Sequence, residues 1–425
     1  MRKIIGVTLC ALMLAALPSM SAAAPVTKQS GQTTDRYIVT LDTGIEGEFH
    51  TNSASVAAEH ASELGATVSH VYQHALNGYA ATMSPSTAAE IAKDPRVRSV
   101  QPDRPVFATA TKAATPPPVP TGVNRVEADR SPTADIDGTD ERVDVDVAVI
   151  DTGIDLKHPD LNVYAKGGKN CWLGWDFLKP TDYHGHGTHV AGTIGALDNG
   201  KGVVGVAPGA RLWPVRVLSP LGSGSTSEVI CGIDYVTEHA DEIDVVNMSL
   251  GGDGADDGNC GRTDGDAMHE AICRSVEKGI TYVVAAGNSN ADAKEMTPAA
   301  YDEVITVSAL ADFDGLPGGR AKSTCLADKD DTFADFSNHG ADVDLIAPGV
   351  CIESTWRFGG YNTISGTSMA SPHVAGGAAL YKAKHPTASP AEVKAALIKA
   401  GSKAWTWPSE DGDAVQEPLL DVSTF

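Results

Sequence analysis

A serine begins a predicted helix in residues 366–376, which read GTSMASPHVAG. A glycine turn precedes Ser368, and the small residues after it predict a helix that another element can approach closely. We expect Pro372 in the first turn, where its missing N–H breaks no internal hydrogen bond. A hydroxyl there lies beside unpaired backbone N–H groups at the positive end of the helix dipole. The hydroxyl could attack a carbonyl while these N–H groups hold the oxyanion, whereas the plainer alternative is a serine that only caps a buried helix.

A carboxylate and a group of imidazoles could complete this chemistry. Asp151 follows an alternating apolar run, residues 143–150, which predicts a strand. Residues 184–192 read HGHGTHVAG and place three imidazoles at the start of a second small-residue helix. Acyl transfer by serine needs a base that takes the hydroxyl proton and an acid that orients the base. Asp151, an imidazole and Ser368 supply this set if one sheet edge brings them together.

The elements that must position these residues alternate between strands and helices. Short β-branched runs are bounded by glycine or proline, with helical segments between several of them. The strand runs are 143–150, 212–218, 245–250, 280–286, 304–309 and 343–347, and the helical segments are 189–197, 226–239 and 267–278. This order predicts a three-layer α/β domain with a mainly parallel sheet, whose ligands lie beyond the carboxyl ends of the strands.

The first part of the chain is organised differently. Residues 1–24 have a charged start, a short apolar run and a small-residue cleavage zone, as in a secretory signal peptide. Residues 36–106 predict the order β-α-β-β-α-β, a small α+β unit with a ferredoxin-like fold. The alanine- and proline-rich residues 108–140 predict an exposed linker and the start of the mature protein. The α/β domain is assigned to 141–400 and a tail to 401–425.

Charge and hydropathy exclude several classes of partner. The formal net charge of −23 argues against nucleic acid and acidic membrane surfaces, because both repel an acidic protein. After the signal peptide no apolar run is long enough to span a bilayer. We therefore expect a secreted, extracellular, soluble monomer. Acidic clusters in 253–266 and 328–331 lack EF-hand spacing and are predicted to be solvated loops.

Six cysteines remain once Cys10 leaves with the signal peptide. An even number in an oxidising compartment favours disulfides, and the C-x-x-C spacing of zinc sites is absent. Two pairs bracket short polar stretches, and the third follows by elimination. The expected pairs are Cys260–Cys273, Cys325–Cys351 and Cys171–Cys231.

The three motifs together resemble the subtilisin-like serine proteases. DTGID, HGHGTHVAG and GTSMASPHVAG occur in the order Asp, His, Ser, and the match runs from about residue 143 to 380. Residues 36–106 resemble the inhibitory propeptide of that family. The resemblance implies that Asp151 orients the base, His186 is the base and Ser368 is the nucleophile. His184 and His189, the neighbouring imidazoles, are expected to be structural.

The resemblance also implies an oxyanion hole and a substrate groove. Asn288, after the strand-like residues 283–287, is expected to donate to the oxyanion beside the backbone N–H of Ser368. Two edges would pair with an extended peptide, and the pocket for the residue before the cut would have small, uncharged walls that suit bulky apolar side chains. The edges are Gly222, Ser223, Gly224 and Ser249, Leu250, Gly251, Gly252; the walls are Gly251, Ala285, Ala286 and Gly287. Pro298 matches a cis-proline of the family, and a trans turn proline is the alternative.

A structural calcium site is a further implication. Residues 158–161 and 197–203 are similar to the family's high-affinity calcium loop, and they offer the oxygen ligands that calcium takes. The candidate ligands are the side chains of Asp160 and Asn199 and the carbonyls of Leu197, Lys201 and Val203. Lys201 departs from the pattern because it adds positive charge nearby.

These observations predict a secreted serine endopeptidase made as a zymogen. It would act on proteins and peptides, cut itself near residues 107–114, and stay inhibited by its own propeptide until that is degraded. An esterase with the same triad is the first alternative, although the G-x-S-x-G motif is missing. The second is an inactive homologue that acts as a binding protein, although all three triad residues and Asn288 are present.

Overall fold

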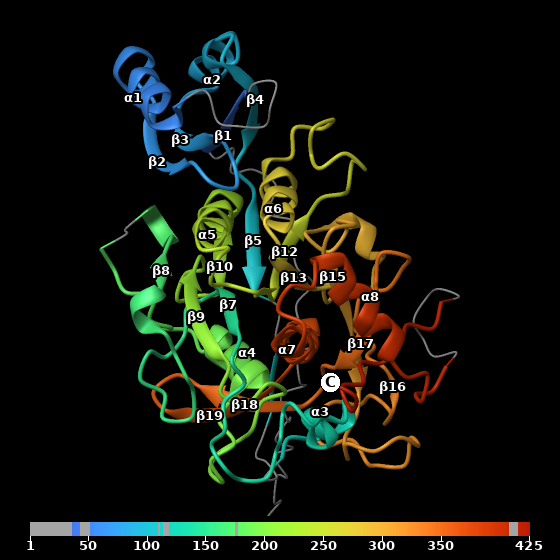
Figure 1. Cartoon of the computed structure of the whole chain (residues 1–425). Helices are drawn as coiled ribbons and strands as arrows, with labels where there is room; N and C mark the ends of the chain where they lie inside the picture. Colours follow the sequence, from blue (N-terminus) through green and yellow to red (C-terminus); the bar gives the residue numbers. More distant parts are fainter. Residues whose placement is uncertain (1–35, 43–51, 109–110, 114–118, 175–176, 408–414) are drawn as a thin grey trace, which may run out of the picture. The chain divides into compact units, whose positions relative to one another are not determined.

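The computed structural model describes residues 36–42, 52–108, 111–113, 119–174, 177–407 and 415–425. Figure 1 shows the arrangement of its helices and strands. The signal peptide expected in residues 1–24 lies outside the described residues. Among the described residues no helix is both long and apolar enough to cross a membrane.

The N-terminal unit is an antiparallel sheet with two helices. The strands run in the order β2-β3-β1-β4, which is the ferredoxin-like order. Asn52 and Ser84 cap the two helices with their side chains, and Val39, Tyr79 and Ile91 lie in a small core. The elements are β1 (Arg36–Leu41), α1 (Ser53–Leu64), β2 (Thr67–Tyr72), β3 (Gly78–Thr82), α2 (Pro85–Ile91) and β4 (Val97–Pro102). The predicted α+β unit is confirmed.

The main sheet has eight strands. Its order is β16-β15-β13-β11-β7-β9-β8, with β17 beside β15, and among these described strands only β16 pairs antiparallel. The strands are β7 (Asp146–Asp151), β8 (Lys169–Asn170), β9 (Arg211–Arg216), β11 (Val245–Met248), β13 (Thr281–Ala285), β15 (Ile305–Ala311), β16 (Thr332–Phe333) and β17 (Leu345–Pro348). The predicted, mainly parallel α/β sheet is confirmed.

Helices cover both faces of this sheet (Figure 1). Val147 and Val149 of β7 belong to one core cluster, with residues of α4 and α7. Ala148 and Ile150 belong to the other, with residues of α5 and α6. Alternate residues of one strand thus enter opposite cores, which explains why residues 147–150 are all apolar although the residues before them alternate. The helices are α4 (His186–Gly195), α5 (Thr226–Glu238), α6 (Ala267–Glu277), α7 (Thr367–Lys384) and α8 (Pro390–Ala400), and α8 packs on α7.

The segment that follows the N-terminal unit contributes one strand, β5 or β6, to each of two smaller sheets. One has the order β10-β5-β12-β14, and the other has the order β18-β19-β6. The strands are β5 (Pro105–Ala108), β6 (Thr111–Ala113), β10 (Ser223–Ser225), β12 (Leu250–Asp253), β14 (Met296–Thr297), β18 (Ile352–Trp356) and β19 (Gly360–Ser365). Both β5 and β6 therefore pair with strands far away in the sequence.

Part of the stretch expected as a linker is packed. Short helices follow in α3 (Thr121–Arg125) and Ala128–Arg130, and Val123 and Val126 are buried in the larger core. Residues 121–130 therefore do not form the exposed linker that was expected for 108–140. They pack as the first segment of the α/β domain. At the other end Leu419 forms a bridge with Ile346.

Six cysteines form three disulfides, in the pairs that the sequence favoured. Their Cα atoms are 5.8 Å apart in Cys171–Cys231 and 5.9 Å apart in the other two pairs. The pairs are Cys171–Cys231, Cys260–Cys273 and Cys325–Cys351. The first joins β8 and α5, so it links segments that composition alone could not associate.

The prediction that residues 328–331 form a solvated loop is wrong. Asp330 and Asp331 are buried, and Asp330 accepts hydrogen bonds from the backbone N–H groups of Phe313, Arg320 and Ala321. Asp331 pairs with Arg125, whose side chain is also buried. These carboxylates are buried because they satisfy loop N–H groups and a buried cation.

The acidic cluster in 253–266 is also more organised than a solvated loop. Asp257 accepts backbone hydrogen bonds from Asn259, Gly261, Thr263 and Asp264. Although desolvation raises the pKa of this carboxyl, the four hydrogen bonds lower it to about 2. The loop is folded around a carboxylate that stays ionised.

Candidate active site

Asp151 and His186 meet at the carboxyl end of β7. Asp151 is the last residue of that strand, and His186 is the first residue of α4; both are buried. Nδ1 of His186 lies 2.8 Å from Oδ1 and 2.9 Å from Oδ2 of Asp151. Nε2 of His186 is buried and has no hydrogen-bond partner in the part of the chain that the structure describes. With its proton held on Nδ1 by the carboxylate, Nε2 can accept a proton.

Asp182, which the sequence analysis missed, fixes the start of α4. Its Oδ1 accepts from Thr152 Oγ1 (2.9 Å) and from the N–H groups of His184 (2.8 Å) and Gly185 (2.7 Å). Its Oδ2 accepts from the N–H and the hydroxyl of Thr188. One buried carboxylate therefore ties the helix that carries His186 to the residue after Asp151. An aspartate four residues before that histidine was the available signal.

His184 and His189 differ from His186 in their partners. Nε2 of His189 faces the carbonyls of Ile352 (3.0 Å) and Asn362 (3.1 Å), and burial lowers its pKa to about 3. Burial also lowers the pKa of His184. In both histidines the lowered pKa favours the neutral imidazole, and neither forms an ion pair with a carboxylate of the described residues.

Ser368 is the second residue of α7 and is fully buried. Its hydroxyl donates to the carbonyl of Ser249 at 3.1 Å, and the Ser249 hydroxyl donates to the carbonyl of Ser368 at 2.9 Å. Asn247, also absent from the predicted set, donates to Ser249 Oγ and accepts from Ser371 Oγ. The serine is thus tied to the end of β11, next to β7.

The expected position of Pro372 is wrong. The helix begins at Thr367, so Pro372 lies in its second turn rather than its first. A proline there cannot donate to the carbonyl four residues earlier, which is that of Ser368. That carbonyl accepts from Ser249 instead, so the missing helix bond is replaced by a bond that holds the serine in place.

Asn288 lies beside the start of α7. Its Oδ1 accepts from the N–H (2.9 Å) and the hydroxyl (2.8 Å) of Thr367, and the Thr367 hydroxyl in turn accepts from the N–H of Gly287. The amide oxygen is therefore occupied by the residue before Ser368. This leaves the amide nitrogen, on a half-buried side chain, as the donor available to a ligand.

The residues expected to hold substrate already hold a strand of the same chain. β5 pairs antiparallel with both edges: Val106 lies opposite Gly224, and Phe107 lies opposite Gly251. The N–H of Ala108 donates to the carbonyl of Gly222 at 2.8 Å. Val106 is 2% exposed, whereas Phe107 is 53% exposed. The groove thus buries alternate side chains of an extended peptide.

Close approach explains one glycine of this groove. A Cβ built on Gly252 would lie 2.8 Å from the carbonyl oxygen of Pro105 in β5. The expected pocket walls lie at the end of β13. Ala285 is the last residue of that strand and Ala286 the next, and both are buried; Gly287 follows with a φ of 107°. The peptide bond from Thr297 to Pro298 is cis, as the family resemblance implied.

Two acidic residues accept hydrogen bonds from backbone N–H groups where the N-terminal unit contacts α5. Asp234 of α5 is buried and accepts from the N–H groups of Gln73, His74 and Ala75 in the N-terminal unit. Conversely, Asp103, which follows β4, accepts from the N–H and the hydroxyl of Ser227 at the start of α5. The N-terminal unit and the α/β domain therefore satisfy each other's unpaired donors.

The expected calcium residues come together around Asp160. Its Oδ1 accepts from Asn199 Nδ2 (2.8 Å), and its Oδ2 accepts from the Val203 N–H and the Tyr361 hydroxyl (both 3.1 Å). Burial raises the pKa of Asp160. Asn199 presents its amide nitrogen to the carboxylate, while its oxygen accepts from the N–H of Lys201 at 2.9 Å. A cation beside Asp160 would therefore require this amide to rotate.

Fold and site define a serine hydrolase of the α/β class. The model of the subtilase family matches residues 143–416, and the model of peptidase inhibitor I9 matches residues 36–109. The chain therefore belongs to the subtilase family. It is a subtilisin-like serine protease that carries an N-terminal inhibitor domain.

Relatives agree with this assignment. The chain is 40% identical over 344 residues to an extracellular serine proteinase of Thermus sp. (strain Rt41A), across 79% of this chain and 73% of the relative. It is 36% identical over 365 residues to subtilisin E of Bacillus subtilis (strain 168), across 85% and 84%. An alkaline serine exoprotease A of Vibrio alginolyticus is 38% identical, and the match spans 57% of its length.

A solved structure agrees as well. A cold-adapted subtilisin-like serine proteinase has a TM-score of 0.54 and is 33% identical, with 71% of this chain and 97% of that chain covered.

Proposed function

We propose that the chain is a secreted endopeptidase made as a self-inhibited zymogen, with Asp151, His186 and Ser368 as its triad. The observation that carries the proposal is β5, which lies as an extended strand between β10 and β12 and ends opposite Leu250, the residue after Ser249. A groove that pairs with peptide backbone on both sides suits a protein substrate better than a small ester. The buried Val106 supports a preference for apolar side chains at that position.

The reaction would be acyl transfer to Ser368. As its Oγ attacks the carbonyl carbon, the hydroxyl proton passes to Nε2 of His186, and Asp151 stabilises the resulting imidazolium. The oxyanion would accept from the backbone N–H of Ser368 and the amide nitrogen of Asn288. His186 then gives the proton to the departing amine, and water releases the acyl group by the reverse steps.

Maturation would cut the chain between Ala108 and Thr111. β5 ends at Ala108, opposite Leu250, and β6 begins at Thr111, opposite Ser365. The carbonyl of Ser249 accepts from the Ser368 hydroxyl, and Ser365 lies three residues before Ser368 in the sequence. Both strands that flank the proposed cut are thus paired with residues that are close to Ser368, either through a hydrogen bond or in the sequence. After the cut, residues 36–108 would remain bound as an inhibitor.

A structural calcium ion is part of the proposal. The carbonyls of Leu197, Lys201 and Val203 accept no backbone hydrogen bond from the described residues, and they lie in the loop that packs on Asp160. Free carbonyls beside a carboxylate and an amide form the donor set of a calcium site. The ion would hold this loop, and no step of the reaction depends on it.

The experiment that tests this function is expression of Ser368→Ala in a protease-free host. The parent should yield a mature chain that starts at residue 109, 110 or 111, read by N-terminal sequencing. The variant should accumulate with residues 36–108 still attached, because the nucleophile that cuts the chain is missing. A mature N-terminus in the variant would show that another enzyme cuts it. Labelling of Ser368 by a fluorophosphonate, together with hydrolysis of casein, separates an endopeptidase from an inactive homologue or an esterase.

A further inference from the structure

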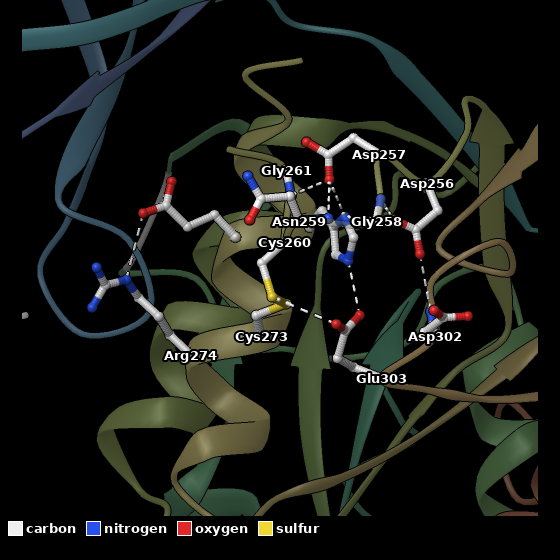
Figure 2. The surroundings of a disulfide bond; sticks show 12 residues. Asp256, Asp257, Gly258, Asn259, Cys260, Gly261, Cys273, Arg274, Asp302 and Glu303 are labelled. Carbon is white, nitrogen blue, oxygen red and sulfur yellow. Dashed lines mark hydrogen bonds and ion pairs between the residues drawn. A yellow bond between two sulfur atoms is a disulfide. The ribbon is translucent and has the colours of Figure 1, made fainter. Parts of the chain in front are cut away.

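A second cluster of ionisable side chains lies in the loop between β12 and α6, outside the site of Ser368. His269 of α6 is 1% exposed, and its Nε2 lies 2.8 Å from Oε2 of Glu303. Figure 2 shows Glu303 next to the Cys260–Cys273 disulfide, with Asp256 and Asp257 on the loop above them. The proposed proteolysis uses none of these side chains.

The other ring nitrogen of His269 faces two carboxylates at ion-pair distance without a hydrogen bond to either. Nδ1 lies 3.5 Å from Oδ1 of Asp256 and 3.7 Å from Oδ1 of Asp257. It is buried and has no hydrogen-bond partner within the described ranges. Both distances exceed the roughly 2.7–3.2 Å of an N–H···O hydrogen bond, so a proton on Nδ1 does not bridge them. A bare nitrogen lone pair facing two carboxylates is electrostatically unfavourable, so this place requires a positive charge: either a proton on Nδ1, which gives ion pairs at these distances, or a metal cation bound to all three side chains.

We propose that Asp256, Asp257 and His269 bind a zinc ion. Zinc takes imidazole nitrogen and carboxylate oxygen at about 2.0–2.2 Å and prefers tetrahedral geometry. With bonds of that length, nitrogen–oxygen separations of 3.5 and 3.7 Å correspond to ligand–metal–ligand angles of about 110–125°. An octahedral ion with right angles would need ligands only about 3 Å apart. The spacing therefore selects a tetrahedral metal.

The surroundings hold these ligands in place before any metal arrives. Glu303 binds Nε2 of His269, which leaves Nδ1 as the metal-facing nitrogen. Asp256 accepts from the N–H groups of Gly258 (2.6 Å) and Asp302 (3.2 Å). The oxygen of Asp257 that faces His269 also accepts from Asn259 (2.8 Å) and Gly261 (2.9 Å). Both carboxylates thus have the backbone support that metal-binding carboxylates have.

The fourth ligand would be a water molecule that enters from a neighbouring cavity. A cavity of about 490 Å³ is lined by Asp256 and Gly258 of the loop and by Lys294, Ala300, Asp302 and Asp342. The ion would join the 254–266 loop, α6 and the turn at Glu303. Its role is structural, and it would supplement the disulfide that closes the same loop.

The test is zinc binding to the full chain in the Ser368→Ala background, which prevents autolysis. Isothermal titration with ZnCl₂ at neutral pH, without reductant, should give one high-affinity zinc ion per chain. His269→Gln should weaken that binding by at least about 100-fold, because it removes the only nitrogen ligand. His385→Gln, which changes an exposed histidine at the end of α7, is the matched control and should bind zinc like the parent. Equal binding by His269→Gln and the control would overturn the site.

Two further measurements keep the proposal falsifiable if His269→Gln fails to fold. Asp256→Asn keeps the shape of the side chain and should also weaken zinc binding. Cobalt(II) bound to the parent should give the intense visible absorption of a tetrahedral nitrogen–oxygen site, and weak octahedral bands would overturn the assignment. Zinc binding that appears only after reduction, with free thiols counted by Ellman's reagent, would assign the metal to Cys260 and Cys273 and overturn the proposal.

Discussion

The surroundings of His186 and those of Asp160 differ in how far their polar atoms are satisfied. Nε2 of His186 has no partner among the described residues, and Asn288 has only its amide oxygen occupied. Both carboxylate oxygens of Asp160, in contrast, already accept hydrogen bonds from the protein. A site built for reaction leaves donors and acceptors open for the transition state, whereas a structural loop can satisfy its own. Changes at the first site should therefore alter rate, and changes at the second should alter stability.

The largest effect should come from Asp151→Asn. The amide keeps the shape of the carboxylate but cannot hold the proton of His186 on Nδ1, so Nε2 loses its ability to accept one. We expect kcat to fall by about 10⁴-fold in protein matured with a trace of active enzyme. Turnover of a peptide substrate measures this, and Asp144→Asn, an exposed aspartate before β7, is the control. A fall of less than tenfold would remove Asp151 from the triad.

The next effect should come from Asn288, and two substitutions separate its two ends. Asn288→Ala should lower kcat by roughly 10²–10³-fold with little change in KM, because its bond to the oxyanion strengthens in the transition state. Asn288→Asp keeps the oxygen that holds Thr367 and loses the donor, so it should lower kcat to a similar extent. If the aspartate variant retains full kcat, the Asn288 side chain only positions Thr367. Its amide nitrogen would then not be an open donor that serves the reaction.

Chelation should affect the region around Asp160 without slowing the reaction. EDTA should lower the melting temperature by roughly 5 °C, and added calcium should restore it, because a ligand of the folded state shifts the unfolding equilibrium. The kcat at 25 °C should stay unchanged. Asp160→Asn should lose the response to calcium. A melting temperature indifferent to EDTA and calcium would mean that the hydrogen bonds to Asp160 already complete this loop.

The smallest effect tests whether an unpartnered buried atom is enough to mark a reactive site. Oε2 of Glu353 in β18 also has no partner within the described chain, and burial raises the pKa of this carboxyl to about 7. Between its ordinary pKa of 4.5 and about 7 the folded state binds more protons than the unfolded state, so stability falls as pH rises through that range.

Glu353→Gln should remove that part of the pH dependence. The variant should melt at a higher temperature than the parent near pH 8 and at a similar one near pH 4, with kcat unchanged. Glu277→Gln, at the exposed end of α6, should keep the slope of the parent. A loss of activity in Glu353→Gln would show that this carboxyl has a part in the reaction.

Local signals predicted the elements that depend on nearby residues. The order of helices and strands in the N-terminal unit matches the predicted one, because its signals are local: α1, for example, has a capping side chain at Asn52 and a glycine at its end, Gly65. The proposed triad could also be assigned from the sequence, because each of its three members lies in a long motif. The resemblance to the family therefore located residues whose geometry it could not describe.

Features that depend on distant partners escaped prediction. Asp331 appeared solvated until the fold placed it against Arg125, 206 residues away. Asp182 has its role because Thr152 and Thr188 converge on it. Likewise, β6 is a strand only because β19 offers an edge. The partners of these residues are set by the packing of the sheet, which no local pattern encodes.

The strand β5 has a consequence for the time course of activation. While it is covalently attached, its effective concentration at the groove is high and independent of dilution. Once the connecting segment is cut, rebinding becomes bimolecular, yet the pairings of Val106 and Phe107 with both edges still delay release. The first molecules to lose the inhibitor can then digest the inhibitor of the others. Activity should therefore appear after a lag that shortens as total protein increases, and a trace of mature enzyme should abolish the lag.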